Sequence, residues 1–199
     1  MKFIIASKNK KKISELERIL TPLGIKAVTE NDLNIKIPEV EETGTTFQEN
    51  AFLKANSACK TSGLPAIADD SGLCVDSLNG APGIYSSRFS GDSATDENNN
   101  ALLIEKLKNI SKEKRTAKFC CAISVVFPNG DEIKCFGECK GLIGFEPSGQ
   151  NGFGYDPYFY VGDKSFASLS ADEKDKISHR GNALRELKIK LKEYLDADK

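Results

Sequence analysis

An apolar run that ends in two adjacent carboxylates is the feature of this sequence that most constrains its fold. The run Ala66-Ile67-Ala68 leads directly into Asp69-Asp70-Ser71-Gly72, and the pattern continues to Val75. It predicts a buried strand that opens into a site. Because side chains alternate across a strand, the two aspartates face opposite sides unless the Ser-Gly pair turns both outward. Paired carboxylates beside glycine suit Mg²⁺ and phosphate chemistry, and the alternative interpretation is a solvated turn.

Length and charge limit the class of protein. A chain of 199 residues is long enough for a sizeable core, and we expect a single domain over residues 1–199. Its 28 basic and 29 acidic residues give a net charge of −1, so there is no overall attraction to nucleic acid or to a membrane surface. No apolar segment approaches the roughly 20 residues of a membrane span, and the first apolar run is too short for a signal peptide. We therefore expect a cytoplasmic protein with no nucleic-acid or membrane partner.

Six cysteines raise the question of a disulfide framework or a metal site. None of them forms a Cys-x-x-Cys pair, and the single histidine, His179, lies far from them in the sequence. Cys120 and Cys121 stand inside an apolar run that predicts a strand, where cysteine serves as a small apolar side chain. We expect reduced, structural thiols, as is usual in the cytoplasm.

The first predicted helix begins with three lysines, at the end where positive charge is unfavourable. Lys10, Lys11 and Lys12 follow the loop Ser7-Lys8-Asn9. The amino end of a helix already carries partial positive charge, so lysines there cost stability unless an anion binds. Backbone N–H groups beside lysines can form a phosphate cradle, and the alternative is a solvated basic turn.

Hydrophobic periodicity predicts strands and helices along the whole chain. Strands are expected at residues 2–6, 25–28, 66–75, 117–127 and 132–139, and helices at 10–20, 47–62, 96–108 and 171–177. Capping boxes at Thr46–Glu49 and Ser170–Glu173 mark two helix starts, and Asn129-Gly130 marks a hairpin. A last helix is expected after Ser178-His179-Arg180-Gly181 interrupts the pattern.

Three features of the predicted helices and loops suit a nucleotide. Lys54 lies beside the buried stripe of its helix, and either extends to water or reaches a phosphate. The glycine-rich loop at residues 147–157 presents Phe153, either to stack on a base or to join the core. His179 and Arg180 supply donors suited to a purine carbonyl oxygen, although a lone histidine is more often structural.

These motifs occur together, in an order that resembles the inosine triphosphate pyrophosphatase family, and they span nearly the whole chain. The matching residues are Ser7-x-Asn9-x-x-Lys12, Glu41-Glu42-Thr43-Gly44-x-Thr46-Phe47-x-Glu49-Asn50-Ala51, Lys54-Ala55, Ala68-Asp69-Asp70-Ser71-Gly72-Leu73, Gly80-Ala81-Pro82-Gly83-Ile84-Tyr85-Ser86, Gly152-Phe153-Gly154-Tyr155-Asp156-Pro157 and Ser178-His179-Arg180-Gly181. The resemblance implies an α/β fold with a long curved mixed sheet flanked by helices. It also implies two lobes with the active site in the cleft between them, and a homodimer.

The activity implied by the resemblance is hydrolysis of non-canonical purine nucleoside triphosphates. The substrates would be the inosine, deoxyinosine and xanthosine triphosphates (ITP, dITP and XTP), cleaved to a monophosphate and pyrophosphate with Mg²⁺ as cofactor. Two alternatives stay open: a pyrophosphatase of canonical or pyrimidine nucleoside triphosphates, and a nucleotide sensor without turnover. The full set of acids and lysines argues against the sensor, because binding alone needs fewer of them.

The resemblance also implies roles for individual residues. Asp70 resembles the general base and a Mg²⁺ ligand, Glu42 resembles the second metal ligand, and Asp69 would support them as a catalytic residue. The residues implied to bind substrate are Ser7, Asn9, Lys12, Lys54, Ser71, Gly72, Phe153, Gly154, Tyr155, Asp156, Lys174, His179 and Arg180. Those up to Gly72 would hold the triphosphate. Phe153 resembles the stacking ring, and the residues from Asp156 onward resemble those around the edge of the base.

Overall fold

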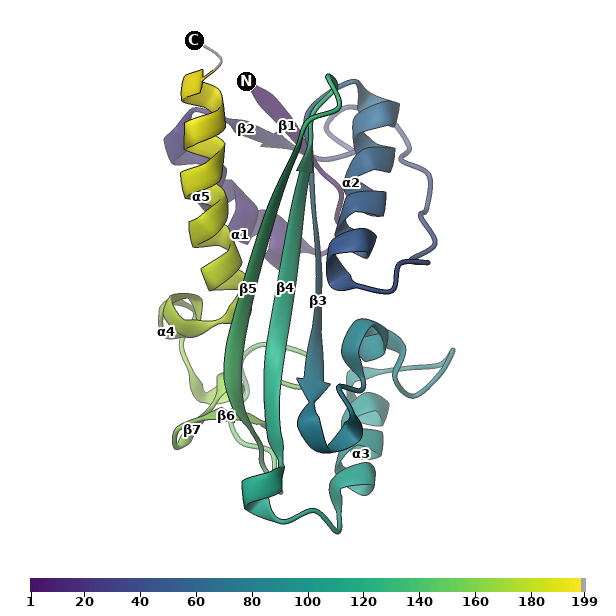
Figure 1. The fold of residues 1–199 in the computed structure, drawn as a ribbon, viewed down its shortest axis with the longest axis vertical. Coiled ribbons are helices and arrows are strands. Elements are labelled where there is room, and N and C mark those ends of the chain that lie inside the picture. The colour runs from purple at the N-terminus through teal and green to yellow at the C-terminus, as the bar shows by residue number, and fades with distance from the viewer. Residues whose placement is uncertain (198–199) are drawn as a thin grey trace. The chain divides into compact units, whose positions relative to one another are not determined.

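The computed structural model describes residues 1–197, apart from the side chain of Lys11, and has a mixed α/β fold with a seven-stranded sheet (Figure 1). The strands are β1 (Lys2–Ile5), β2 (Lys26–Val28), β3 (Ala66–Val75), β4 (Thr116–Val126), β5 (Glu132–Ile143), β6 (Phe159–Val161) and β7 (Lys164–Ser165). The helices are α1 (Lys10–Leu20), α2 (Phe47–Ser62), α3 (Asp96–Leu107), α4 (Ala171–Ile177) and α5 (His179–Ala197). The strand order is β2-β1-β3-β4-β5-β6-β7.

The sheet is mixed because its two ends are built differently. β1 is parallel to both of its neighbours, β2 and β3, whereas β6 is antiparallel to β5 and β7. Contacts divide the chain into two compact units. The first unit comprises residues 1–70, residues 121–136 and the chain from Ala183 onward; the second comprises residues 71–120 and 137–182.

The first unit buries both faces of its part of the sheet. Phe3 and Ile5 of β1 pack in one cluster with residues of α1 and α5, such as Leu16 and Leu187. Ile4 lies between them in sequence, and it packs in a separate cluster with the alanines of α2. This alternation follows from the two-residue period of a strand. α1 and α5 therefore cover one face, and α2 covers the other (Figure 1).

α2 approaches the sheet closely because its buried stripe consists of small residues. Ala51, Ala55 and Ala58 are fully buried. The helix begins with the predicted capping box. The side chain of Thr46 accepts a hydrogen bond from the backbone N–H of Glu49, and the side chain of Glu49 accepts one from the backbone N–H of Thr46. This cap fixes where the helix begins and therefore which residues face the sheet.

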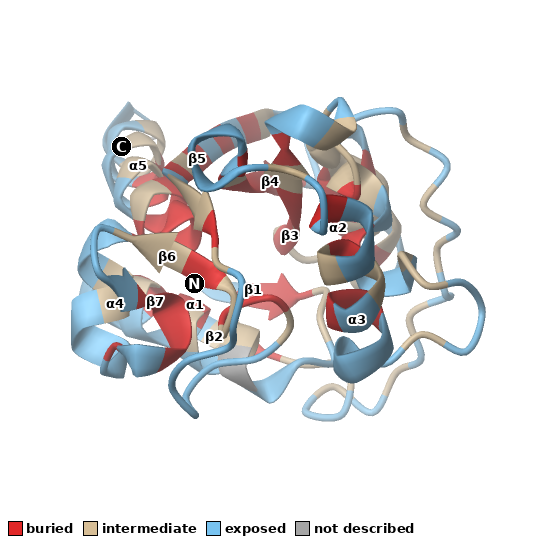
Figure 2. Ribbon diagram, turned by 90° about the horizontal axis from the view of Figure 1, so that it is seen from below, coloured by how far each residue is buried: buried red, intermediate tan, exposed pale blue. Residues whose placement is uncertain are grey.

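The second unit has its own core around aromatic rings. Phe119 of β4 contacts Phe159 at a centroid distance of 4.7 Å and stacks on Phe166 at 5.8 Å. α3 buries Leu103 and Leu107 in the same cluster. Figure 2 shows the resulting two-sided character of α3, with buried residues on one side and exposed residues on the other.

Two glycines near the expected ends of elements lie inside regular elements. β5 continues through Gly141, where a Cβ atom would lie 2.3 Å from the carbonyl oxygen of Tyr160. α5 begins at His179 and includes Gly181, where a Cβ atom would lie 1.9 Å from the carbonyl oxygen of Asp175 in α4. The strand expected at residues 132–139 thus continues to Ile143, and the interruption expected at 178–181 is confined to Ser178, because both glycines allow close approach of two backbones.

The expectations for the cysteines and for membrane segments can be compared with residues 1–197, which include all six cysteines. No disulfide joins any of these cysteines. No helix within this range is both long and apolar enough to cross a bilayer.

Candidate active site

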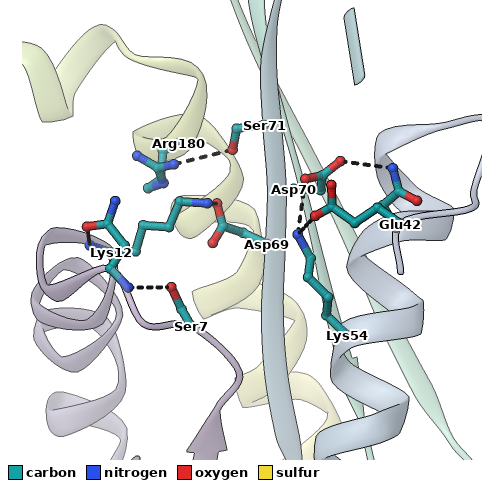
Figure 3. A network of polar contacts seen from close by, with 10 residues as sticks. Ser7, Lys12, Glu42, Lys54, Asp69, Asp70, Ser71 and Arg180 are labelled. Atoms are coloured by element: carbon teal, nitrogen blue, oxygen red, sulfur yellow. Dashed lines mark hydrogen bonds and ion pairs between the residues drawn. The ribbon is translucent and has the colours of Figure 1, made fainter. Parts of the chain in front are cut away.

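The two adjacent aspartates lie on opposite sides of β3. The strand continues without a turn from Ala66 to Val75, so the alternation that applies to any strand separates Asp69 from Asp70. Figure 3 shows Asp69 directed towards Lys12 and Asp70 directed towards Lys54. The predicted strand therefore carries a separate ion pair on each face, and the interpretation as a solvated turn is wrong.

On the α2 side of β3, two carboxylates converge on one lysine. Lys54 Nζ lies 2.8 Å from Glu42 Oε1 and 3.1 Å from Asp70 Oδ1. Glu42 comes from the loop before α2, Lys54 comes from the third turn of α2, and Asp70 comes from β3 (Figure 3). Three separate segments thus bring two acidic oxygens to a single cation.

Asn50 is a member of this site that the sequence analysis did not select. It is fully buried, and its Nδ2 donates to Asp70 Oδ2 at 3.4 Å. Its Oδ1 accepts from the backbone N–H of Gly44 at 2.9 Å. A side chain at Gly44 would collide with this amide, because a Cβ atom there would lie 2.6 Å from Asn50 Oδ1. The available signal was spacing, since Asn50 and Lys54 are four residues apart and share one helix face.

The electrostatics of this site show an excess of negative charge. Burial raises the pKa of Asp70 above its ordinary value, and the nearby charge of Glu42 adds to the effect, despite the opposing attraction of Lys54. Burial lowers the pKa of Lys54, but the attraction of Asp70 and Glu42 outweighs it, so the net pKa is raised. Lys54 therefore stays protonated, while the two carboxylates are not fully balanced by one lysine.

A divalent cation fits this donor set. Mg²⁺ commonly binds through one or two carboxylates and leaves its other positions to water and substrate phosphate. Glu42 and Asp70 supply two such groups, and both already meet a cation at Lys54. Among the described residues, no group of three or more His, Cys, Asp or Glu side chains is arranged to hold a metal ion.

On the other side of β3, the start of α1 faces Asp69. Lys12 Nζ lies 2.9 Å from Asp69 Oδ2, a carboxylate that is almost completely buried. Ser7 Oγ accepts from the backbone N–H of Asn9 at 3.2 Å, and Asn9 Oδ1 accepts from that of Lys12 at 3.4 Å. The predicted phosphate-cradle residues thus form one local network (Figure 3).

The next residues of β3 belong to the second unit. Ser71 Oγ accepts from Arg180 Nη2 at 3.3 Å, and Gly72 is buried within the strand. His179 stacks on the ring of Phe119 at a centroid distance of 4.8 Å, with the planes 15° apart. His179 and Arg180 both lie in the first turn of α5, and they contact different partners: His179 contacts the ring of Phe119, and Arg180 contacts the hydroxyl of Ser71.

The glycine-rich loop places a ring beside an ion pair. Lys174 Nζ lies 2.5 Å from Asp156 Oδ2 and 5.4 Å from the centroid of the Phe153 ring. Asp156 Oδ2 also accepts from the backbone N–H of Phe153 at 3.0 Å. Asp156 is 3 % exposed, whereas Phe153 is 40 % exposed. An accessible ring is thereby held next to a buried carboxylate and a lysine.

The remaining predicted residues, Gly154 and Tyr155, have different surroundings. Gly154 is bonded through its backbone to α3. Tyr155 is buried, and its hydroxyl donates to the carbonyl oxygen of Ser86 at 2.8 Å. Burial raises the pKa of this hydroxyl. The side chain of Tyr155 is therefore part of the core of the second unit.

Comparison with known proteins gives the same family throughout. The model of the Ham1 family matches residues 3–190. A dITP/XTP pyrophosphatase from an Exiguobacterium species is 50% identical over 193 residues, which are 96% of this chain and 97% of that protein. One from Haemophilus influenzae is 48% identical over 194 residues, covering 96% and 98%.

Solved structures agree with the sequence relatives. A HAM1 protein from Coxiella burnetii superposes with a TM-score of 0.90 at 43% identity, covering 97% of this chain and 99% of that one. A nucleoside-triphosphatase / dITP/XTP pyrophosphatase from Mycobacterium abscessus gives a TM-score of 0.79 at 45% identity, covering 94% and 97%. The family resemblance inferred from the motifs is confirmed, and this chain belongs to the Ham1 family.

Proposed function

We propose that this chain is a nucleoside triphosphate pyrophosphatase that acts on dITP, XTP and ITP. It hydrolyses the bond between the α- and β-phosphates and releases a nucleoside monophosphate and pyrophosphate. The observation that carries the proposal is the convergence of Glu42 and Asp70 on Lys54. The names of the full-length relatives supply the substrate class.

Asp70 is proposed to act as the general base. In the chain without metal, burial raises the pKa of its carboxylate, and the group is proposed to orient and deprotonate the attacking water. Asn50 fixes the carboxylate by donating to its second oxygen. Asp69 is proposed to support catalysis through Lys12, with which it pairs, since its own carboxylate faces the other side of β3.

Glu42 and Asp70 would hold Mg²⁺, which when bound neutralises phosphate charge and stabilises the leaving pyrophosphate. Lys12 and Lys54 are proposed to contact the triphosphate, where they stabilise the negative charge that develops during cleavage. Ser7, Asn9, Ser71 and Gly72 are proposed to complete the phosphate contacts. Each lysine already lies against a carboxylate, so its ammonium group is held in place before substrate binds.

The second unit is proposed to recognise the base. Phe153 would stack on the purine, because its ring is accessible and aromatic stacking tolerates any base. Asp156, Lys174, His179 and Arg180 would contact its edge, with Gly154 and Tyr155 shaping the loop. A site that donates to a 6-keto oxygen rejects adenine, whose 6-amino group leaves those donors unpaired.

A substrate panel tests the proposed function. Pyrophosphate release is measured with dITP, XTP, ITP, dATP, dGTP and dCTP, each with Mg²⁺ and with a chelator. We expect turnover of the first three, dependent on Mg²⁺, and little turnover of the others. Efficient cleavage of dATP or dCTP would identify the enzyme as one for canonical or pyrimidine nucleotides, and binding without turnover would identify a sensor.

Glu42→Gln sharpens this test, with Glu41→Gln as its matched control. Glu41 is an exposed neighbour of the same type in the same loop. We expect Glu42→Gln to raise the Mg²⁺ concentration needed for half-maximal activity, and Glu41→Gln to leave it unchanged.

Three further expectations stay predictions: a homodimer, a cytoplasmic location and an active site in a cleft between two lobes. Sedimentation analysis tests the first.

A further inference from the structure

Side chains from the first turns of α3 form hydrogen bonds with both the N–H and the carbonyl oxygen of Gly154. Its N–H donates to Asp96 Oδ2 at 2.7 Å, and its carbonyl oxygen accepts from Asn100 Nδ2 at 2.9 Å. Asp96 and Asn100 are four residues apart, so they project from the same face of the helix. A second bond from Asn100 Nδ2 to the carbonyl oxygen of Asp96, at 2.8 Å, joins the two anchors to each other.

Gly154 stands between two residues that are held in other ways. Phe153, the proposed stacking ring, has its N–H bonded to Asp156, and the hydroxyl of Tyr155 is bonded to Ser86. Gly154 itself adopts a φ of +60°, which residues with a side chain rarely adopt. Its conformation sets the direction of the chain immediately after the ring, so a change at Gly154 changes where the ring lies.

Packing connects α3 to the residue after Gly154, since Tyr155 lies in the same buried cluster as Leu103 and Leu107. A pocket of about 410 Å³ is lined by residues of α3, such as Glu97 and Ala101, and by Phe153 and Gly154 of the loop. At this pocket, the hydrogen bonds from Asp96 and Asn100 connect α3 directly to Gly154.

Asn100 is an unfavourable residue for core packing alone. It is 8 % exposed, and its Oδ1 has no hydrogen-bond partner among the described residues. An apolar side chain would avoid this unsatisfied acceptor. The amide is oriented by its two Nδ2 bonds, since the reversed amide would bring its oxygen against the carbonyl oxygens of Asp96 and Gly154.

We propose that Asp96 and Asn100 are positioning residues for base recognition, which hold Gly154 so that the Phe153 ring is pre-oriented for stacking on the purine. This inference rests on the proposed function, because it assigns the ring to the substrate base. Neither side chain touches the substrate; both act through the backbone of the loop.

The kinetic test uses Asn100→Ala, with Asn98→Ala, an exposed asparagine of the same helix, as the matched control. We expect Asn100→Ala to raise the KM for dITP about tenfold, because a misdirected ring loses part of the binding free energy of one base-stacking contact. The value of kcat should change less than about twofold. The inhibition constant of inorganic tripolyphosphate, which has no base, should not change. A parallel loss of kcat and of tripolyphosphate binding would overturn the proposal.

A double-mutant cycle with Phe153→Ala shows whether Asn100 acts through the ring. If it does, Asn100→Ala has no further effect on KM once Phe153 is alanine, whereas independent effects would multiply and contradict the proposal. Asp96→Asn keeps an acceptor for the Gly154 N–H and should retain a lower KM than Asp96→Ala. Equal KM values for these two variants would remove Asp96 from the proposal.

Amide hydrogen exchange tests the clamp without any turnover. The Gly154 N–H should exchange at least about tenfold faster in Asp96→Ala than in the wild-type chain, because its acceptor is gone. An unchanged rate would overturn the clamp even if dITP is a substrate. A faster rate together with no turnover of dITP by the wild-type chain would support the clamp and reject the proposed function instead.

Discussion

Asp69 and Asp70 are consecutive residues of β3, yet each pairs with a different lysine on a different face of the strand. Asp69 Oδ2 lies 2.9 Å from Lys12 Nζ, and Asp70 Oδ1 lies 3.1 Å from Lys54 Nζ. The two carboxylates therefore do not act as a joined pair, even though they are adjacent in sequence. Their consequences for activity should be separable by mutation.

Asp70→Asn is expected to lower kcat by about 10²- to 10⁴-fold, the usual worth of a general base. Asp69→Asn should act mainly on KM, because it releases Lys12 rather than altering the proposed base. Steady-state kinetics with dITP measure both variants. A kcat for Asp70→Asn equal to that of the wild-type chain would show that another group is the base.

Asp70→Asn should also affect stability, in a direction set by pKa. Burial raises the pKa of Asp70, so the folded chain binds this proton more tightly than the unfolded chain. Stability is then lost as the pH rises from the unfolded-state pKa through the folded-state pKa, and the loss is complete above that window. The neutral asparagine avoids this loss. We expect Tm of Asp70→Asn at neutral pH to equal or exceed that of the wild-type chain, both without metal.

Asp32→Asn is the control of opposite sign. Hydrogen bonds from the backbone and side chain of Thr29 lower the pKa of Asp32, so its ionised form contributes stability that is lost as the pH falls through the folded-state pKa. Asp32→Asn should therefore lower Tm at neutral pH. Thermal unfolding over a pH series checks both variants, and a lower Tm for Asp70→Asn at neutral pH would contradict the first expectation.

Lys12→Ala is expected to raise KM about tenfold or more, the worth of one charge-assisted hydrogen bond to phosphate. It also leaves Asp69 without its lysine, so Tm should fall. The double variant Lys12→Ala, Asp69→Asn removes the buried charge and should recover Tm but not KM. Lys10→Ala, an exposed lysine in the same turn, is the control. An unchanged KM for Lys12→Ala would place the phosphate contacts elsewhere.

Asn50→Ala tests the residue that the sequence analysis did not select. The change removes the donor to Asp70 and the acceptor for the Gly44 N–H, so the proposed base loses its fixed orientation. We expect kcat to fall about tenfold, as is typical when a residue that hydrogen-bonds to a metal ligand or catalytic base is removed. KM should change little. Asn56→Ala, on the same helix, should have no effect on either constant. Wild-type kcat in Asn50→Ala would exclude this role.

Local patterns explain which parts of the fold could be predicted from the sequence. The bounds of α1 and α2 agree with the prediction because hydrophobic periodicity marks α1 and a capping box marks the start of α2. β6 and β7 were missed, since strands of three and two residues show no alternation. β5 runs past Cys139 and α5 begins before Gly181, because Gly141 and Gly181 allow a close approach of backbones that local patterns do not show.

In the candidate site, too, local motifs indicate which residues take part, whereas contacts between separate segments are not visible in the sequence. The residues Glu42, Lys54 and Asp70 could be selected from motifs, but not the fact that one lysine lies between both carboxylates. The separation of Asp69 from Asp70 could be expected from alternation alone, provided that β3 continued. Asn50 was not selected, because its partners are a loop glycine and a strand carboxylate rather than residues of its own helix.

Arg115 is a further residue whose importance no local pattern indicated. It is 1 % exposed, and its guanidinium donates to the carbonyl oxygens of Leu107 at 2.7 Å and Ile110 at 3.0 Å, near the end of α3. It also donates to the carbonyl oxygen of Gly144 at 3.1 Å, beyond the end of β5. One side chain thus satisfies carbonyls of two elements that are far apart in the sequence.

Arg115→Met should therefore lower the free energy of unfolding by about 3 kcal/mol or more, because each buried acceptor left without a donor costs about 1–3 kcal/mol. Arg115→Lys should not restore stability, since a single ammonium group lacks the planar fork that reaches several carbonyls at once. Urea unfolding measures both variants, with the exposed neighbour Lys114→Met as the control. If Arg115→Lys unfolds at the same urea concentration as the wild-type chain, the multiple bonding of the guanidinium is not what stabilises this end of the second unit.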